Sequence, residues 1–136
     1  DIGQTNPKEN LPWVKSFMSI KDQLNYKFIF CLEGKCISTN LYWAMSSNSV
    51  CVMPKPKYES WFMEGKLKDG VHYIKVKDDF SDAEEKIEFY NNNNDKCLEI
   101  IDNAQKFVEQ FKDRKRERLI QLLILKQYFK STGQYG

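Results

Sequence analysis

The chain has 136 residues, of which 41% are hydrophobic, a size and composition that suit one domain with a core of its own. Its 21 basic and 19 acidic residues nearly balance, so the net charge of +2 does not by itself imply any class of partner. No apolar run approaches the roughly 18 residues that a membrane span needs, and the start lacks both methionine and a signal-like segment, which fits a mature or cut piece of a longer protein.

The first half of the chain predicts a parallel α/β sheet. Residues 1–11 are polar and irregular apart from a short strand at the very start, and residues 12–24 predict a loop and a short amphipathic helix. Short apolar runs suited to buried parallel strands follow at 27–32, 50–53 and 72–76. Helices are predicted between these strands at 40–46 and at 58–63, the first with Leu41, Ala44 and Met45 on one face. We expect a small parallel sheet with helices on both faces.

The second half predicts only helices. Residues 81–84 have the spacing of a capping box, in which the Ser81 hydroxyl and the Glu84 carboxylate each accept from the other's backbone N–H. The helix that it starts reaches about Tyr90, the asparagines at 91–94 stop it, and Asp95 caps the next one. The apolar stripe of that next helix is Leu98, Ile101, Phe107 or Val108, and Phe111.

The last predicted helix, at about 114–130, is apolar on more than one face. Its large apolar side chains are Leu119, Ile120, Leu122, Leu123, Ile124, Leu125, Tyr128 and Phe129. Such a helix needs cover on two sides, from this domain and from something else. We therefore divide the chain into one domain at about 12–112 and a C-terminal helix at about 113–131.

The turn between the first predicted strand and the first predicted helix has the features of an anion site. The strand ends on Glu33-Gly34, a polar loop follows, and Ser38-Thr39-Asn40 stand at the head of the helix as caps. The free N–H groups of a first helical turn, and the positive end of its dipole, point at whatever occupies such a loop. A phosphate-bearing ligand is therefore expected, and the alternative is an ordinary capped turn of the kind that any α/β protein has.

The cysteines Cys31, Cys36, Cys51 and Cys97 are even in number but show no CxxC motif and no paired spacing. Three of them lie in or beside apolar segments, where free cysteine behaves as a small hydrophobic residue. We expect a buried, reduced role, since cytosolic proteins keep their thiols reduced. A metal site would need His72 or carboxylates to converge with these thiols, and the spacing gives no sign of it.

Several short motifs follow one another along the chain in an order typical of one enzyme family. They are Tyr26-Lys27-Phe28, Glu33-Gly34, Ser38-Thr39-Asn40, Ser46-Ser47-Asn48-Ser49-Val50, Trp61-Phe62, His72-Tyr73-Ile74-Lys75-Val76 and Asp79-Phe80-Ser81-Asp82. Over roughly residues 17–134 the chain resembles glycosyltransferase family 90, which includes protein O-glucosyltransferases, fungal capsule-associated xylosyltransferases and bacterial lipopolysaccharide-core glycosyltransferases. Thr39-Asn40-Leu41, Met53-Pro54-Lys55-Pro56 and Trp61-Phe62-Met63-Glu64-Gly65 are most similar to the bacterial lipopolysaccharide branch.

The resemblance implies a GT-B architecture, with two Rossmann-like halves and the active site in the cleft between them. The C-terminal half binds the nucleotide-sugar donor, and the N-terminal half binds the acceptor and supplies the catalytic base. Only the C-terminal half is matched here, so the resemblance implies a donor-binding Rossmann-like domain without catalytic residues of its own. The chemistry of the family needs no bound metal or other cofactor.

Carried over by position, the donor diphosphate would lie on the loop Gly34, Lys35, Cys36, Ile37, Ser38, Thr39 and Asn40. Ser38 fits the serine that many family members place there. Many members carry arginine where this chain has Asn40, and lysine where it has Tyr42. The first difference is shared by the bacterial branch, and the second removes a positive charge. Lys35 is the cation that would compensate for the second difference.

Four further side chains have both a structural and a binding interpretation. His72, at a strand start, is expected to be a hydrogen-bonded structural histidine, and the alternative is a contact to donor sugar or phosphate. Glu59 and Glu64 either support a helix or accept hydrogen bonds from sugar hydroxyls, while Trp61-Phe62 between them pack as core. Glu33 would repel a diphosphate unless it faces ribose hydroxyls, so a structural role is equally open.

Two charged clusters also admit more than one interpretation. Asp78, Asp79 and Asp82 resemble an acidic metal site, but Asp82 is better explained by a helix start, and metal is not expected. The basic run 112–118 is either a solvated helix face or a patch drawn to anionic lipid headgroups, each residue adding about 1 kcal/mol. Nucleic-acid binding is not expected, because no aromatic or groove motif accompanies the run.

The function expected is donor binding in a glycosyltransferase that adds a sugar to a lipopolysaccharide core or a similar glycan. The expected partners are a nucleotide sugar, a glycan or lipid-linked acceptor, an N-terminal half and, through the last helix, that half or a second copy. The expected location is the cytoplasm, with peripheral contact to the inner membrane left open. The alternatives are a non-catalytic nucleotide-binding module with a flavodoxin-like sheet and an interaction domain that docks through the last helix.

Overall fold

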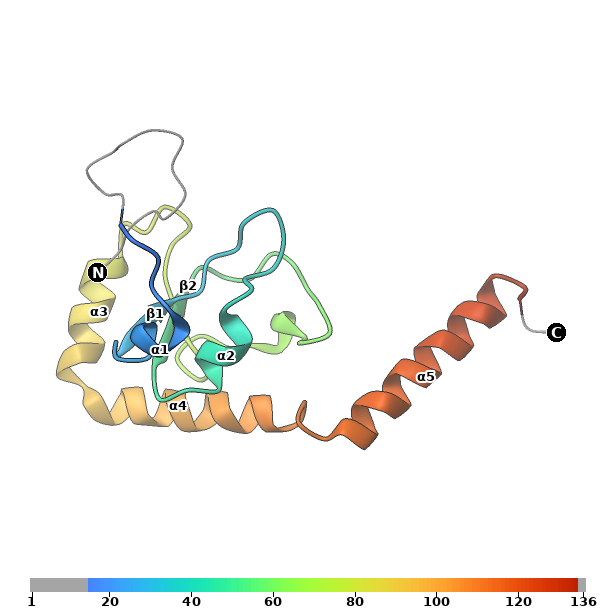
Figure 1. Cartoon of the computed structure of the whole chain (residues 1–136). Helices are drawn as coiled ribbons and strands as arrows, with labels where there is room; N and C mark the ends of the chain where they lie inside the picture. Colours follow the sequence, from blue (N-terminus) through green and yellow to red (C-terminus); the bar gives the residue numbers. More distant parts are fainter. Residues whose placement is uncertain (1–14, 135–136) are drawn as a thin grey trace.

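A computed structural model describes residues 15–134, so the short strand expected at the very start lies outside the described residues (Figure 1). Three parallel strands form one sheet in the order β1-β2-β3. They are β1 (Phe28–Phe30), β2 (Val50–Met53) and β3 (Ile74–Lys75). The helices are α1 (Ile20–Gln23), α2 (Leu41–Met45), the 3-10 helix η1 (Glu64–Lys66), α3 (Ala83–Asn92), α4 (Asn94–Glu109) and α5 (Arg114–Ser131). The expected α/β class is confirmed, with outer strands shorter than predicted.

The two faces of the sheet carry separate cores because side chains alternate along each strand. Ile29, Cys51 and Tyr73 belong to a core that α2 covers with the three apolar residues predicted for that face, Leu41, Ala44 and Met45. The neighbouring residues Val50, Val52, Ile74 and Val76 belong to the other core, which Cys97 and Ile100 of α4 cover. β2 is buried at all four positions, as expected for a strand with neighbours on both edges.

Helix α4 crosses the edge of the sheet at which the strands begin. Its Gln105 side chain donates to the backbone oxygen of Ser47, just before β2, and its Phe107 ring contacts His72, just before β3. Its buried residues are Cys97, Ile100, Ala104 and Val108, followed by Phe111 beyond its end. The predicted stripe is therefore wrong at its start, where Leu98 is 56% exposed. The predicted Asp95 cap is also wrong, because Asp95 lies in the first turn of α4, whose N-cap is Asn93 and makes no side-chain bond.

Residues 58–63 do not form the helix predicted for them. They form a turn that leads into η1, and Met63 has a left-handed backbone with φ 56°. The cause is local, since Ser60 donates both its N–H and its hydroxyl to the Glu64 carboxylate. Such side-chain bonds to nearby backbone compete with helical hydrogen bonds.

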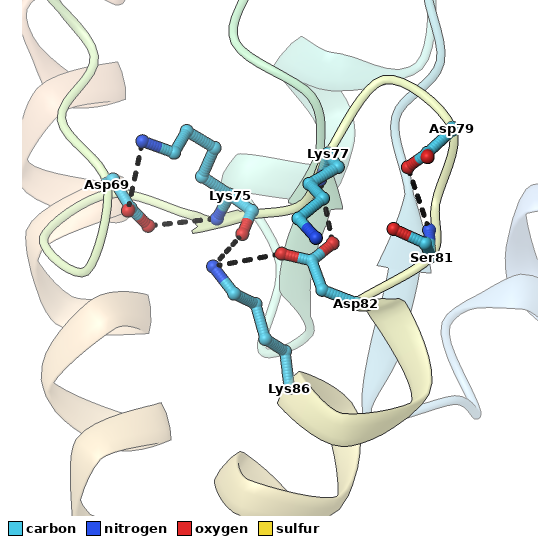
Figure 2. Close-up of polar contacts among 7 residues, drawn as sticks. All are labelled: Asp69, Lys75, Lys77, Asp79, Ser81, Asp82 and Lys86. Carbon is cyan, nitrogen blue, oxygen red and sulfur yellow. Dashed lines mark hydrogen bonds and ion pairs between the residues drawn. The ribbon is translucent and has the colours of Figure 1, made fainter.

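The outer edge of β3 is closed by side chains (Figure 2). The N–H of Lys75 donates to the Asp69 carboxylate at 2.9 Å, and the Lys86 ammonium donates to the Lys75 carbonyl. Lys86 belongs to α3, so its bond to the Lys75 carbonyl holds that helix against the strand, and Lys86 also pairs with Asp82 at the start of the helix. Both outward backbone groups of Lys75 are satisfied in this way, and pairing with a further strand is blocked at that residue.

The predicted capping box at 81–84 does not form. The Asp82 carboxylate accepts from the N–H of Lys77 at 2.7 Å, and the Ser81 N–H donates back to Asp79 (Figure 2). Helix α3 starts after Asp82 without a side-chain cap bond. Asp79 and Asp82 accept hydrogen bonds from the loop before the helix. Because the Ser81 N–H is bonded to Asp79, it is not paired with Glu84 as the capping box requires.

Helix α5 projects away from the sheet and its helices (Figure 1). It follows an Asp113 cap that accepts from the N–H groups of Lys115 and Arg116. None of its 18 residues is buried. Among residues 15–134, no helix combines the length and the hydropathy that crossing a membrane requires.

Candidate functional site

A pocket of about 190 Å³ lies at the carboxyl edge of the sheet, where all three strands end. It is formed by the segments that follow β1, β2 and β3. Its lining residues are Cys31, Leu32, Glu33, Ser38, Leu41, Met53, Pro54, Pro56, Lys57, Glu64, Asp78 and Phe80. Open α/β sheets bind ligands in the crevice outside the carboxyl ends of their strands, so this pocket is the candidate site.

The loop after β1 is held by its own side chains. The Ser38 hydroxyl donates to Asn40 Oδ1 at 2.6 Å, and Asn40 Nδ2 donates to the carbonyl of Phe30 at 2.9 Å. The Asn40 amide therefore turns back to the strand and does not cap α2, which corrects the predicted cap. Ser38 is buried and lines the pocket, whereas Gly34, Lys35, Cys36 and Thr39 are exposed and Ile37 is half-buried.

Helix α2 contributes less electrostatic attraction than the sequence pattern suggests. It has only five residues, and the N–H of its first residue, Leu41, donates to the carbonyl of Ser38. A macrodipole needs several aligned turns. The groups at this edge with positive charge or partial positive charge are therefore the backbone N–H groups of the loops and the lysines Lys35 and Lys57.

Glu33 joins the loop after β1 to the segment after β2. Its carboxylate accepts from the backbone N–H groups of Lys57 and Tyr58, with N–O distances of 3.1 Å. The Lys57 ammonium then lies 2.8 Å from the Asp78 carboxylate, which raises the lysine pKa by hydrogen bonding and charge attraction. These contacts link the three segments that line the pocket.

One of the lining residues of the pocket is a buried carboxylate, that of Glu64. Glu64 is 3% exposed, and both of its oxygens accept from Ser60. Phe62 beside it is buried in the core, as predicted, but Trp61 is 61% exposed and lies against Tyr42 and Phe111. Glu64 is therefore a fixed acceptor that lines the pocket. Of its two interpretations, support of a helix at 58–63 is ruled out because that helix is absent, and contact with sugar hydroxyls stays open.

Two of the predicted site residues lie elsewhere. His72 is at the opposite, amino edge of the sheet, where the N–H of Lys68 donates to its Nδ1 at 3.0 Å. Burial and then the positive charge of Lys68 lower the pKa of this histidine, so the neutral ring is favoured. Glu59 is exposed and does not line the pocket, and its carboxylate lies over Gly65. Among the residues with a predicted binding interpretation, Glu33, Ser38 and Glu64 line the pocket. The others do not: Gly34, Lys35, Cys36, Ile37, Thr39, Asn40, Glu59 and His72.

Lys57, Phe80 and Pro56 are pocket residues that the sequence analysis did not propose as ligand contacts. The predicted strand order could have indicated them, because parallel strands place the residues that follow each strand at the same edge of the sheet. For Asp78 the sequence suggests only membership of an acidic cluster in which metal is not expected. Within residues 15–134 no three His, Cys, Asp or Glu side chains are grouped to hold a metal ion.

All four cysteines are free, and Cys36 is the exposed exception to the expected burial.

Comparison with known proteins gives consistent matches. Residues 4–131 match the family model described as "Glycosyl transferase family 90". The "O-glucosyltransferase LpsA" of Dichelobacter nodosus is 48% identical over 118 residues, which cover 87% of this chain but only 37% of that protein. "Uncharacterized protein 179R" of Invertebrate iridescent virus 6 is 33% identical over 101 residues, and "Uncharacterized protein 035R" of Invertebrate iridescent virus 3 is 30% identical over 99. The matched regions are 8% and 9% of those viral proteins.

Proposed function

This chain belongs to glycosyltransferase family 90, and on that premise we propose that it is the donor-binding part of a glycosyltransferase. The glycan that we propose as its product is lipopolysaccharide or a related polymer, which is consistent with the name of the relative from Dichelobacter nodosus. The observation that carries the proposal is the pocket at the carboxyl edge of the sheet, built from all three post-strand segments.

The lining of the pocket fits a donor that is rich in hydroxyl groups at one end and anionic at the other. Glu64 and Ser38 are buried, hydrogen-bonded groups that face the pocket and suit ribose or sugar hydroxyls. Lys57 lies at the pocket, and the exposed Lys35 lies in the loop after β1. In this arrangement the cations and loop N–H groups would stabilise the charge that develops on the departing nucleotide.

The catalytic base is proposed to come from another part of the enzyme. The aligned region is 37% of the Dichelobacter nodosus protein, so that relative has room for a second, acceptor-binding half. We propose that residues 12–112 form the donor domain in a GT-B arrangement and that the exposed α5 packs across the second half. The basic residues at 112–118, which precede and open α5, would add attraction to an anionic membrane surface.

Saturation-transfer NMR of the purified chain with a panel of mononucleotides, nucleoside diphosphates and nucleotide sugars tests this function. A nucleoside diphosphate sugar is expected to give the strongest signal, and the signal should weaken in Ser38→Ala. Equal binding of mononucleotides would favour a non-catalytic nucleotide-binding module. No nucleotide binding at all, with no effect of Ser38→Ala, would instead favour an interaction domain. Measurable sugar transfer by the 136 residues alone would contradict the assignment of the base to another part.

A further inference from the structure

The Glu33 carboxylate occupies a position that suits an external anion. Two consecutive backbone N–H groups, those of Lys57 and Tyr58, point at the same carboxylate with N–O distances of 3.1 Å. Converging N–H groups of successive residues form a concave anion-binding element in many phosphate sites. Here that element lies beside the pocket, and its present occupant is a carboxylate of the same chain.

The charges around the pocket disfavour entry of a diphosphate as long as the Glu33 carboxylate keeps its present position. The lining includes three carboxylates, Glu33, Glu64 and Asp78, and one ammonium, that of Lys57. The Lys57 ammonium is already paired with Asp78 at 2.8 Å. A diphosphate that entered beside Glu33 would meet a like charge at short range and would find both N–H groups taken. If Glu33 rotates away, the repulsion and the competition are removed together.

Glu33 is able to leave, unlike the other pocket acid that accepts hydrogen bonds. Glu64 is 3% exposed and bonded on both oxygens by Ser60, whereas Glu33 is only half-buried and follows the end of β1 in an irregular loop. Gly34 follows it, and a Cβ at Gly34 would have no neighbouring atom within 4 Å. The backbone next to Glu33 is therefore open on the Cβ side of Gly34, and the half-buried Glu33 side chain is itself partly accessible to solvent.

We propose that the N–H groups of Lys57 and Tyr58 form the anion-binding element of this pocket, and that a phosphate group of the ligand displaces Glu33 from them. Glu33 then acts as an internal competitor that lowers the affinity of the pocket for phosphate. When the pocket is empty, its carboxylate holds the segment after β2 through the N–H groups of Lys57 and Tyr58. This inference rests on the proposed function for the identity of the ligand, a nucleoside diphosphate. The displacement itself requires only that the ligand carry a phosphate.

Backbone amide NMR of the full chain, titrated with inorganic pyrophosphate and separately with uridine diphosphate, tests the proposal. In the unmodified chain the largest shifts are expected at the N–H groups of Lys57 and Tyr58. Glu33→Gln should bind pyrophosphate about fivefold more tightly, because a neutral amide replaces a charge-assisted acceptor and the repulsion is lost. Glu88→Gln is the matched control, since it removes the same charge from an exposed position on α3 and should bind like the unmodified chain.

The possible results separate this inference from the proposed function. Shifts at these two amides with pyrophosphate but no binding of uridine diphosphate would support the anion element and count against a uridine nucleotide donor. Binding of uridine diphosphate that leaves both amides unmoved, with Glu33→Gln equal to Glu88→Gln, would overturn the inference and leave the donor-binding role intact. Absence of pyrophosphate binding to both the unmodified chain and Glu33→Gln would also overturn it. The unmodified chain is informative even if the Glu33 variant unfolds.

Discussion

Ser60 donates both its backbone N–H and its hydroxyl to the buried carboxylate of Glu64, and both donor–acceptor distances are 2.7 Å. The two residues thereby determine the turn at 60–63 and orient the carboxylate of a residue that lines the pocket. A buried carboxylate with two donors from one residue also makes this turn sensitive to substitution at either position.

Replacing Glu64 by alanine should destabilise the fold. The change leaves the Ser60 N–H and hydroxyl without an acceptor in a partly buried turn and empties the buried Glu64 site, and we expect a loss of about 1–3 kcal/mol in the free energy of unfolding. Ser60→Ala keeps the N–H bond and should cost about 1 kcal/mol. Urea denaturation measures both, with Glu88→Gln as the exposed control, and equal midpoints for Glu64→Ala and Glu88→Gln would contradict the prediction.

The single histidine should make stability depend on pH. Burial and Lys68 lower the folded-state pKa of His72 below its ordinary value of 6.5, so the unfolded chain binds the proton more tightly. The stabilising contribution is present above pH 6.5 and is lost as the pH falls through the lowered folded value. Protonation also removes the lone pair that accepts from the N–H of Lys68.

Urea midpoints measured between pH 7.5 and pH 5.5 are expected to fall in the unmodified chain. In His72→Gln, which cannot titrate, the fall over the same interval should be smaller. Parallel slopes in the two proteins would show that another group is responsible. The interval avoids the acid range in which Asp79 and Asp82, whose pKa values are lowered by hydrogen bonds, take up protons.

The side chains that cover the outer edge of β3 should protect the chain from self-association as well as stabilise it. Asp69→Ala and Lys86→Met each remove the side chain that satisfies one backbone group of Lys75, and each should cost about 1 kcal/mol. The double variant presents a free strand edge and should self-associate more than the unmodified chain. Sedimentation velocity measures this, and Asp102→Ala, which breaks only an exposed helical ion pair, is expected to remain unchanged. A monomeric, fully stable double variant would contradict the protective role of these side chains.

Helix α5 should govern the surface properties of the isolated chain without contributing to the core. Its apolar residues Leu119, Leu122, Leu123 and Ile124 are all more than half exposed. Serine at all four positions should reduce binding of a hydrophobic dye and any dimerisation, while the unfolding midpoint of the rest of the domain stays unchanged. A large fall in that midpoint would show instead that α5 packs on its own domain in solution.

The sequence predicted the elements whose signals are periodic. The buried face of α2 and the residues of β2 match the predicted positions. The apolar residues of α2 all face one core, and every residue of β2 is buried in one core or the other. The turn at 58–63 and the start of α3 were mispredicted for a shared reason. In both, short polar side chains bond to nearby backbone, and the choice between that and a helical cap depends on the local chain path.

The site was predictable by location more than by residue. Ser38 and Glu33 follow directly from the end of a parallel strand, which is where such sheets place their ligands. Lys57 was missed because its contact with Glu33 joins positions 24 residues apart, which no local pattern encodes. His72 makes a hydrogen bond of the structural kind that its place at a strand start indicates, and strand direction puts it at the amino edge, away from the pocket.

Because α4 supplies Ile100 to one core and Val108 to the other, the two cores share one helix. Withdrawing that helix would open both cores at once, although α2 also covers one of them. The chain between β1 and α4 is thus built to melt as one cooperative unit, with no intermediate that keeps one face intact, while α5 is free to fray independently.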